Sequence, residues 1–108
     1  MLLPMSTTAG MTAEAVLEIL RAHEAELRAA GIRRMSLFGS VARGEAGPES
    51  DVDLAVELDP EAHVSLLDLV ALDRHVGELL GRRVELLPEP VERPRLRANI
   101  ERDRLHVF

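Results

Sequence analysis

The chain has 108 residues, of which 46% are hydrophobic and only 2% aromatic, so it can build one domain around an aliphatic core. Its net charge of −6 at pH 7 argues against broad nucleic-acid binding, which needs a basic surface. The absence of cysteine excludes disulfides and zinc–thiolate sites and fits a reducing compartment, so we expect a cytoplasmic protein. We also expect no signal peptide, and no apolar run approaches the roughly 18 to 20 residues that span a bilayer.

The first third of the chain predicts a flexible start, a long helix and a short strand. We expect residues 1–11 to be a flexible N-terminus and residues 12–108 to form one domain. A helix is predicted over 12–30, because Thr12 is a suitable N-cap, apolar residues recur at the helical period and Gly31 suits the position after the helix. A buried strand is predicted over 34–38, followed by a turn and a one-turn helix over 41–43 that Ser40 would cap.

The rest of the chain predicts two further strands, two helices and a closing edge strand. Residues 51–58 alternate apolar and polar side chains, as a half-buried strand does, and 83–87 is a third strand. Ser65 is the expected N-cap of a helix over 65–80, with Asp68 at the capping-box position. The buried face of this helix is expected to consist of Leu66, Leu69, Val70, Val76, Leu79 and Leu80.

A last helix is predicted over 93–105, with Leu96 and Ile100 facing inward, and residues 106–108 can add a short edge strand. The order of elements predicts one α/β (α+β) domain, in which a small mixed sheet is backed by helices on one face. The other face, which carries carboxylates, is expected to stay open.

Two aspartates open the strand at 51–58. Asp51 and Asp53 are two residues apart, so in a strand both side chains aim at the same space. Like charges placed so closely raise each other's pKa unless a cation intervenes, and Mg²⁺ prefers such hard oxygen ligands. If the strands at 51–58 and 83–87 are neighbours with aligned core faces, Glu85 joins the aspartates as a third carboxylate.

The turn before these strands provides groups that suit an anion. Gly39 lets backbone N–H groups approach a phosphate closely, and Ser40 offers a hydroxyl at a helix start. Arg43 follows one helical turn later and could pair with a phosphate or with Asp51. Taken singly, a Gly-Ser pair is usually an ordinary turn and Asp-x-Asp is usually a solvated strand end. Only the two together, at this spacing, indicate a functional site.

That conjunction resembles a known family. The stretch SLFGSVARGEAGPESDVDLAVEL (36–58) resembles the signature of the DNA polymerase β-like nucleotidyltransferase superfamily, in which Gly-Ser is followed at a distance by Asp-x-Asp. The forms at 39–44 and 50–54, together with residues 65–87 and 96–108, resemble its minimal nucleotidyltransferase (MNT) branch. The resemblance spans roughly residues 14–108.

The resemblance implies a site that binds two Mg²⁺ ions and a nucleoside triphosphate, with ATP as the expected substrate. Asp51 and Asp53 would hold the metals, while Gly39, Ser40 and Arg43 would bind the phosphates. The third carboxylate of the family, usually an aspartate, falls on Glu85, which is one methylene longer. Glu85 would serve either as a metal ligand or as the group that activates the acceptor hydroxyl, or it would mark a weak enzyme.

The resemblance also implies a function. Members of the superfamily transfer a nucleoside monophosphate to a hydroxyl and release pyrophosphate, and stand-alone MNT proteins resemble antitoxins whose partner is a HEPN-domain toxin. We therefore expect a protein adenylyltransferase that neutralises a HEPN partner. Two alternatives stay open: an inactive MNT-fold module that inhibits its partner by contact, and a transferase acting on a small molecule or an RNA end.

Other charged and apolar features have simpler interpretations. The segment 93–104 carries five arginines against Glu101 and Asp103, and we expect a solvated helix face there. The four histidines show no ligand spacing and are expected at the surface. Surplus apolar surface on the helix at 65–80 could serve a homo-oligomer or the HEPN partner.

Overall fold

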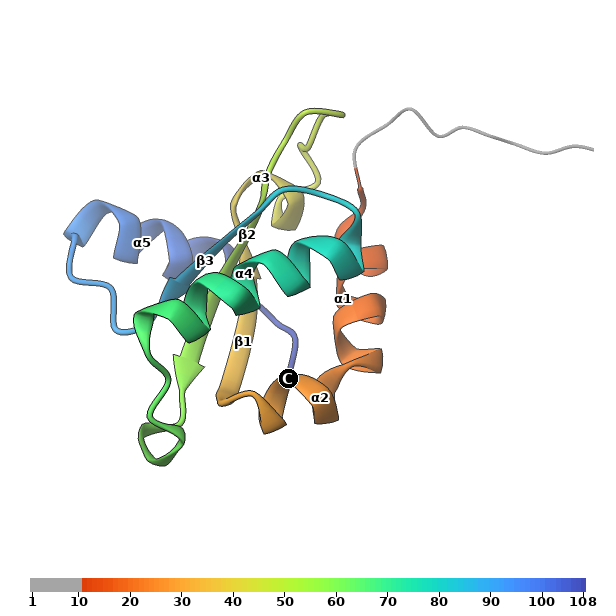
Figure 1. The fold of residues 1–108 in the computed structure, drawn as a ribbon. Helices are drawn as coiled ribbons and strands as arrows, with labels where there is room; N and C mark the ends of the chain where they lie inside the picture. Colours follow the sequence, from red (N-terminus) through yellow and green to blue (C-terminus); the bar gives the residue numbers. More distant parts are fainter. Residues whose placement is uncertain (1–10) are drawn as a thin grey trace, which may run out of the picture.

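The computed structural model describes residues 11–108, in which a four-stranded mixed sheet carries helices on both faces (Figure 1). In chain order the elements are α1 (Ala13–Ala22), α2 (Glu24–Ala29), β1 (Ile32–Phe38), α3 (Gly39–Ala42), β2 (Val52–Leu58), the 3₁₀ turn η1 (Pro60–Ala62), α4 (Leu66–Leu80), β3 (Val84–Pro88), α5 (Pro94–Asp103) and β4 (Leu105–His106). Residues 1–10 of the predicted flexible start lie outside the described part. No helix in 11–108 is long and apolar enough to cross a membrane.

The sheet has the strand order β3-β2-β1-β4. β1 pairs antiparallel with both β2 and β4, whereas β2 and β3 run parallel, with α4 as the connection between them. The register places Asp53 opposite Phe38 on one side and opposite Glu85 on the other. The predicted alignment of the two carboxylate-bearing strands is therefore confirmed, and it decides where the polar groups of the sheet meet.

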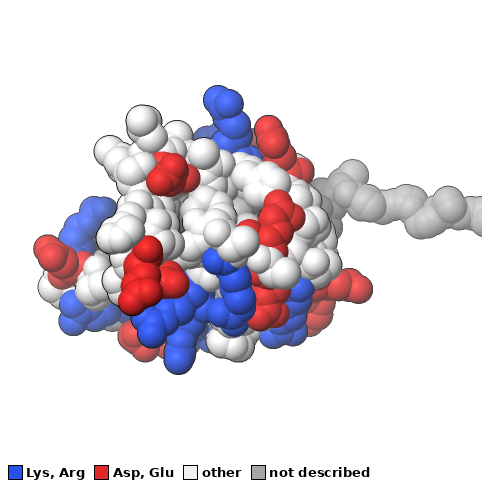
Figure 2. Space-filling model, turned by 60° about the horizontal axis from the view of Figure 1, so that its bottom comes forward, with Lys and Arg blue, Asp and Glu red and all other residues white. Residues whose placement is uncertain are grey.

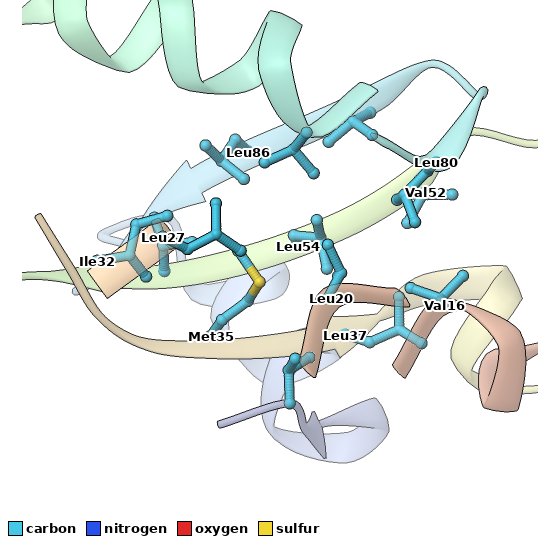
Figure 3. Packing of buried hydrophobic residues seen from close by; sticks show 14 of the residues in the cluster. Val16, Leu20, Leu27, Ile32, Met35, Leu37, Val52, Leu54, Leu80 and Leu86 are labelled. Carbon is cyan, nitrogen blue, oxygen red and sulfur yellow. The ribbon is translucent and has the colours of Figure 1, made fainter. Parts of the chain in front are cut away.

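One face of the sheet is covered by α1, α2 and α4, and this layer contains the main core (Figure 3). The core is aliphatic, as the composition predicts: Leu20 of α1 and Leu27 of α2 pack with Met35 of β1, Leu54 of β2 and Leu86 of β3. Alternation along the strands sends every second side chain into this layer. The predicted α/β fold class and the mixed sheet are confirmed.

The opposite face of the sheet is covered in part by α5. Ile100 of this helix forms a second, smaller buried cluster with Phe38 of β1 and Ala55 of β2. The expectation of helices on one face therefore holds for α1, α2 and α4, whereas α5 packs on the carboxylate face. The reason is that Leu96 and Ile100 are four residues apart, so they form an apolar stripe that needs its own partner in the sheet.

The helix predicted over 12–30 is interrupted at His23. Thr12 caps α1 as predicted, because its Oγ1 accepts a hydrogen bond of 3.1 Å from the N–H of Ala15. At His23 the backbone (φ −108°, ψ 18°) leaves the helical region, and α2 begins at the next residue. Gly31 follows α2 with φ +110°, a value that suits a glycine placed after a helix.

Helix α4 begins and ends as predicted but turns a different face inward. Ser65 and Asp68 form a reciprocal capping box, and Gly81 ends the helix in the left-handed conformation. The inward stripe is Leu69, Leu72, Val76 and Leu80. The prediction was wrong for Leu66 and Val70, which are 76% and 60% exposed. Val70 lies about 100° around the helix from Leu69, and no element within residues 11–108 covers Leu66.

The end of the described chain adds an edge strand, as predicted. β4 pairs with β1 through Ser36 and Leu37, and the last two residues continue beside β1. The N–H of Met35 donates to the carbonyl oxygen of Phe108 over 3.1 Å, and the side chains of Val107 and Phe108 are buried. The C-terminal residues are therefore part of the core layer.

Candidate active site

A cavity of about 340 Å³ lies on the carboxylate face of the sheet, between the ends of the strands and α5. Its walls come from four separate parts of the chain. The residues that line it are Phe38, Gly39, Ser40, Arg43, Asp53, Glu85, Leu87, Leu96, Asn99 and Asp103. Five of the six predicted site residues are therefore brought together in one cavity, and Asp51 is the exception.

Asp53 and Glu85 form the acidic centre of the cavity. They sit opposite each other on the parallel strands β2 and β3, so both side chains leave the same face of the sheet. Partial burial, and then the negative charges of Glu85 and Asp51, raise the pKa of Asp53 to about 6. A carboxylate that resists ionisation for these reasons is stabilised in its charged form by a bound cation.

Asp51 lies at the rim rather than in the cavity. It directly precedes β2, its side chain is half-exposed, and its Oδ1 is 3.7 Å from Nε of Arg83. It is still close enough for its charge to raise the pKa of Asp53. Its predicted role as a metal ligand stays a prediction.

Gly39 is required by the position of Asp53. Its φ of +81° belongs to the left-handed region, and a β-carbon at this position would overlap the Oδ2 atom of Asp53. The turn can therefore approach the carboxylate closely only because residue 39 has no side chain. Because residue 39 has no side chain, the backbone of Gly39 and Ser40 stays accessible to a ligand bound by the carboxylates.

Ser40 lines the cavity but does not cap the helix, so this part of the prediction was wrong. α3 begins one residue earlier, at Gly39, and Phe38 is its N-cap, with no side-chain capping bond. The reason is that Gly39 takes up the turn itself and leaves Ser40 inside the first helical turn. Its hydroxyl is thus not used for capping.

Arg43 is held at the edge of the cavity by two carboxylates. Its Nε donates to Oε1 of Glu45 over 2.9 Å, and its Nη1 donates to Oδ2 of Asp103 over 2.7 Å. The positive charge of Arg43 also reaches Asp53, whose pKa it lowers slightly against the larger opposing effects. Arg43 therefore faces the predicted phosphate region, although its ion pair with Asp103 was not predicted.

The wall contributed by α5 was missed. Leu96, Asn99 and Asp103 line the cavity, whereas a solvated basic face was expected for this segment. Asp103 is buried between Arg102 and Arg43, and hydrogen bonds from these two arginines lower its pKa to about 2. A signal was present, because residues 96, 99, 100 and 103 follow the i, i+3, i+4, i+7 spacing of one helix face.

A larger hollow of about 660 Å³ lies on the other side of α5, away from the carboxylate pair. Arg104, which directly follows α5, lines this hollow and pairs there with Glu89, and Arg33 and Arg34 lie within 4.0 Å of Glu57. Figure 2, which turns the lower end of the molecule forward, shows acidic and basic side chains side by side on this face of the molecule. Because the charges of this hollow neutralise one another, its size alone does not make it the functional site.

The chemistry of the donor set suits a hard divalent cation. Within 11–108, no three His, Asp or Glu side chains are drawn together as a complete metal cage. Mg²⁺ does not need one, because it is commonly held by one or two carboxylates together with substrate phosphates. The Asp53–Glu85 pair, with Asp51 at its rim, fits such an ion.

Residues 16–107 match the family model for the nucleotidyltransferase domain. Protein adenylyltransferase MntA of Thermococcus cleftensis is 44% identical over 78 residues, which cover 71% of this chain and 77% of the relative. A solved structure of a minimal nucleotidyltransferase is 38% identical, with a TM-score of 0.70 over 88% of this chain and 95% of its own.

A more distant structural neighbour supports the fold alone. The structure of the tri-AMPylated Shewanella oneidensis HEPN toxin with its MNT antitoxin has a TM-score of 0.62, at 16% identity over 85% of this chain and 71% of that one. At this identity the shared feature is the arrangement of strands and helices. The family itself is fixed by the sequence matches.

Proposed function

Because the chain belongs to the nucleotidyltransferase domain family, we propose that it transfers AMP from ATP to a hydroxyl group of a HEPN-domain toxin and thereby neutralises it. Membership of the family makes the chain a nucleotidyltransferase. The identities of the nucleotide donor, the metal and the acceptor are what we propose. The resemblance to MntA supports a protein as the acceptor, because that relative is a protein adenylyltransferase.

The observation that carries the proposal is the placement of Asp53 and Glu85 beside the Gly39–Ser40 turn. The two carboxylates are in register on neighbouring strands, and the turn lies close enough to Asp53 to exclude any side chain at residue 39. A cation-binding pair next to an open backbone turn is what a nucleoside triphosphate requires, since its charge must be neutralised while its phosphates are held.

In the proposed mechanism the three carboxylates would bind the metal, Glu85 would also accept the proton of the hydroxyl, and the turn and Arg43 would bind the phosphates. Asp51, Asp53 and Glu85 would hold Mg²⁺, which supplies positive charge against the triphosphate when bound. The backbone at Gly39 and the hydroxyl of Ser40 hold the phosphates that leave, and Arg43 binds them from the α3 side. The acceptor oxygen attacks the α-phosphorus in line, a P–O bond to pyrophosphate breaks, and Glu85 is placed to take the hydroxyl proton.

Positioning and electrostatics supply most of the catalysis in such a site. The cavity is small and its turn is fixed by contact with the sheet, so the reacting groups are ordered before the substrate arrives. Substituting Asp53 by Asn removes one metal-binding charge with little change in volume. We therefore expect Asp53→Asn to lower transfer by at least 100-fold while the fold persists.

The test is an intact-mass measurement of both proteins after incubation with ATP, Mg²⁺ and a HEPN-domain protein encoded beside this chain. We expect the HEPN protein to gain the mass of one or more adenylyl groups with the wild type and none with Asp53→Asn. Glu57→Gln is the matched control, because Glu57 lies on the same face of β2 but outside the cavity. It should transfer at the wild-type rate.

Three results would contradict parts of the proposal. Transfer by Asp53→Asn at the wild-type rate would overturn the site. A stable complex with no mass gain would favour inhibition by contact, for which the exposed leucines of α4 provide a surface. Adenylylation of RNA ends or small molecules, with the HEPN protein unmodified, would replace the acceptor.

A further inference from the structure

We propose that Asp103 is a positioning residue, which fixes the guanidinium of Arg43 at the edge of the cavity so that its free N–H groups meet a nucleotide phosphate. The inference deepens the proposed function and rests on it. Asp103 lies in α5, 60 residues from Arg43, and neither the family signature at 36–58 nor the carboxylate strands include it.

The first support is that Asp103 is a buried anion with fixed partners. Its side chain is only 3% exposed and accepts three charge-assisted hydrogen bonds. One comes from Nη1 of Arg43 (2.7 Å to Oδ2), and two come from Arg102, with Nε at 2.9 Å from Oδ1 and Nη2 at 3.2 Å from Oδ2. Such bonds are stronger and more directional than neutral ones, so the carboxylate holds its arginines in defined orientations.

The second support is that Asp103 is the more firmly held of the two anchors of Arg43. The other anchor, Glu45, is two residues away and its side chain is 64% exposed. Solvent-exposed ion pairs contribute little to holding a side chain, because water and salt screen them. The orientation of Arg43 therefore depends mainly on the buried carboxylate.

The third support is what remains available on Arg43. Its guanidinium has five N–H donors, and the bonds to Glu45 and Asp103 involve only Nε and Nη1. Within residues 11–108 the Nη2 donors have no hydrogen-bond acceptor in the protein, and Arg43 lines the same cavity as Asp53. A planar guanidinium fixed on one side and open on the other is suited to a phosphate oxygen.

The fourth support is the path of the chain. Arg43 directly follows α3, which carries the Gly39–Ser40 turn, whereas Asp103 ends the helix that forms the opposite wall. Their ion pair therefore joins the phosphate turn to α5. Loss of the bond would free Arg43 at the point where the substrate must be held still.

The test is the binding of MgATP by titration calorimetry to the full chain and four variants. We expect Asp103→Asn and Arg43→Gln each to weaken binding about tenfold, because both remove the same oriented donor. The double variant should bind no more weakly than Arg43→Gln alone, since Asp103 has nothing left to orient. Arg102→Ala is the matched control: it removes the other partner of Asp103, does not line the cavity, and should change binding less than twofold.

A kinetic readout separates positioning from folding. If Asp103 orients a substrate contact, Asp103→Asn raises KM for ATP more than it lowers kcat; if it only supports the fold, kcat falls with the active fraction and KM stays constant. Should Asp103→Asn fail to fold in a thermal-unfolding assay, Asp103→Glu replaces it. This variant keeps the negative charge, but its extra methylene group displaces the guanidinium of Arg43. We expect a loss of MgATP affinity that is smaller than tenfold.

The outcomes are distinguishable. Wild-type binding by Asp103→Asn, or losses that add in the double variant, would overturn the positioning role and leave the proposed function intact. A wild-type protein that binds no MgATP at all would overturn the proposed function and this role with it.

Discussion

The strictest constraint at the scale of single residues is between Gly39 and Asp53. Residue 39 has a positive φ, and its missing side chain makes room for a carboxylate from the neighbouring strand. Sequence reasoning predicts the glycine as a phosphate contact. It does not predict that the glycine is also required by the carboxylate beside it, because the distance between two strands is set by folding.

Because of this constraint, alanine substitutions at Gly39 and Gly44 should lower the free energy of unfolding by different amounts. Gly39→Ala should lower the free energy of unfolding by about 2 to 4 kcal/mol, the sum of backbone strain and the overlap with Asp53. Gly44→Ala is the control, because Gly44 has a similar φ of +75° but open space around its β-carbon, and it should cost about 1 to 2 kcal/mol. Urea unfolding measures both. Equal losses would show that Asp53 does not press against residue 39.

Asp103 predicts how the protein responds to acid. Its folded pKa of about 2 lies below its ordinary value of 3.8, so the unfolded state binds a proton more readily than the folded state. The stabilising contribution is therefore complete above about pH 5 and is lost progressively as the pH falls through 3.8 toward 2. Asp103→Asn should show a smaller loss of stability than the wild type across this interval, as measured by thermal unfolding at each pH.

An identical acid profile in wild type and Asp103→Asn would contradict the three hydrogen bonds that Asp103 accepts from Arg43 and Arg102. Arg102→Ala offers a second check, because it removes the bonds that lower the pKa of Asp103 most. It should shift the start of acid unfolding to higher pH. The other titratable groups are unchanged in both variants, so their contributions cancel in the comparison.

At the scale of elements, helix α4 shows where sequence patterns succeed and where they fail. Its capping box and its glycine end follow from local chemistry, and both were predicted correctly. Its buried face was predicted incorrectly at Leu66 and Val70, because a leucine-rich helix presents several apolar stripes. Which stripe turns inward is decided by the sheet and by α1, and neither can be read from the helix itself.

A buried and an exposed leucine of α4 should respond differently to substitution by alanine. Leu72→Ala should lower the free energy of unfolding by about 2 to 4 kcal/mol, because it leaves a cavity in the core. Leu67→Ala should change it by less than about 0.5 kcal/mol, because this side chain is 81% exposed. Denaturant unfolding of both variants checks the pair. A large loss for Leu67→Ala in the isolated protein would mean that another surface covers α4.

At the scale of the whole molecule, the sequence predicts the strands of the site better than its walls. Asp53 and Glu85 could be placed side by side because the alternation of apolar residues fixes which face each strand turns to the core. Asn99 and Asp103 share a helix face with Leu96 and Ile100, but the sequence does not say that this face meets the carboxylate side of the sheet, because the packing of α5 depends on the smaller cluster around Phe38. The arginines of 93–104 indicate a solvated helix face, and only the structure shows that Arg102 of this segment pairs, together with Arg43, with the buried Asp103.

Truncating the side chain of Phe108 should destabilise the whole fold. Phe108 is buried in the main core, and the guanidinium of Arg28 lies 4.8 Å from the centre of its ring. Phe108→Ala should therefore cost about 3 to 5 kcal/mol, by loss of buried surface and of a cation–π contact. Arg28→Ala removes the cation–π contact together with the hydrogen bonds from Arg28 to Glu24 and to the carbonyl oxygen of Arg33, and should cost about 1 kcal/mol or less because these groups are exposed. Thermal unfolding of the two variants shows how far the loss in Phe108→Ala exceeds that in Arg28→Ala, as expected if the buried ring contributes most.

The cavity has a consequence for the timing of synthesis, because its two sides come from distant parts of the chain. The Gly39–Ser40 turn leaves the ribosome well before the wall with Leu96, Asn99 and Asp103, because β2, α4 and β3 lie between them in the chain. A chain that is still being translated can pair β1 with β2, yet it cannot close the cavity or anchor Arg43. A nascent chain should therefore be unable to hold nucleotide, and activity should begin only once α5 has been released.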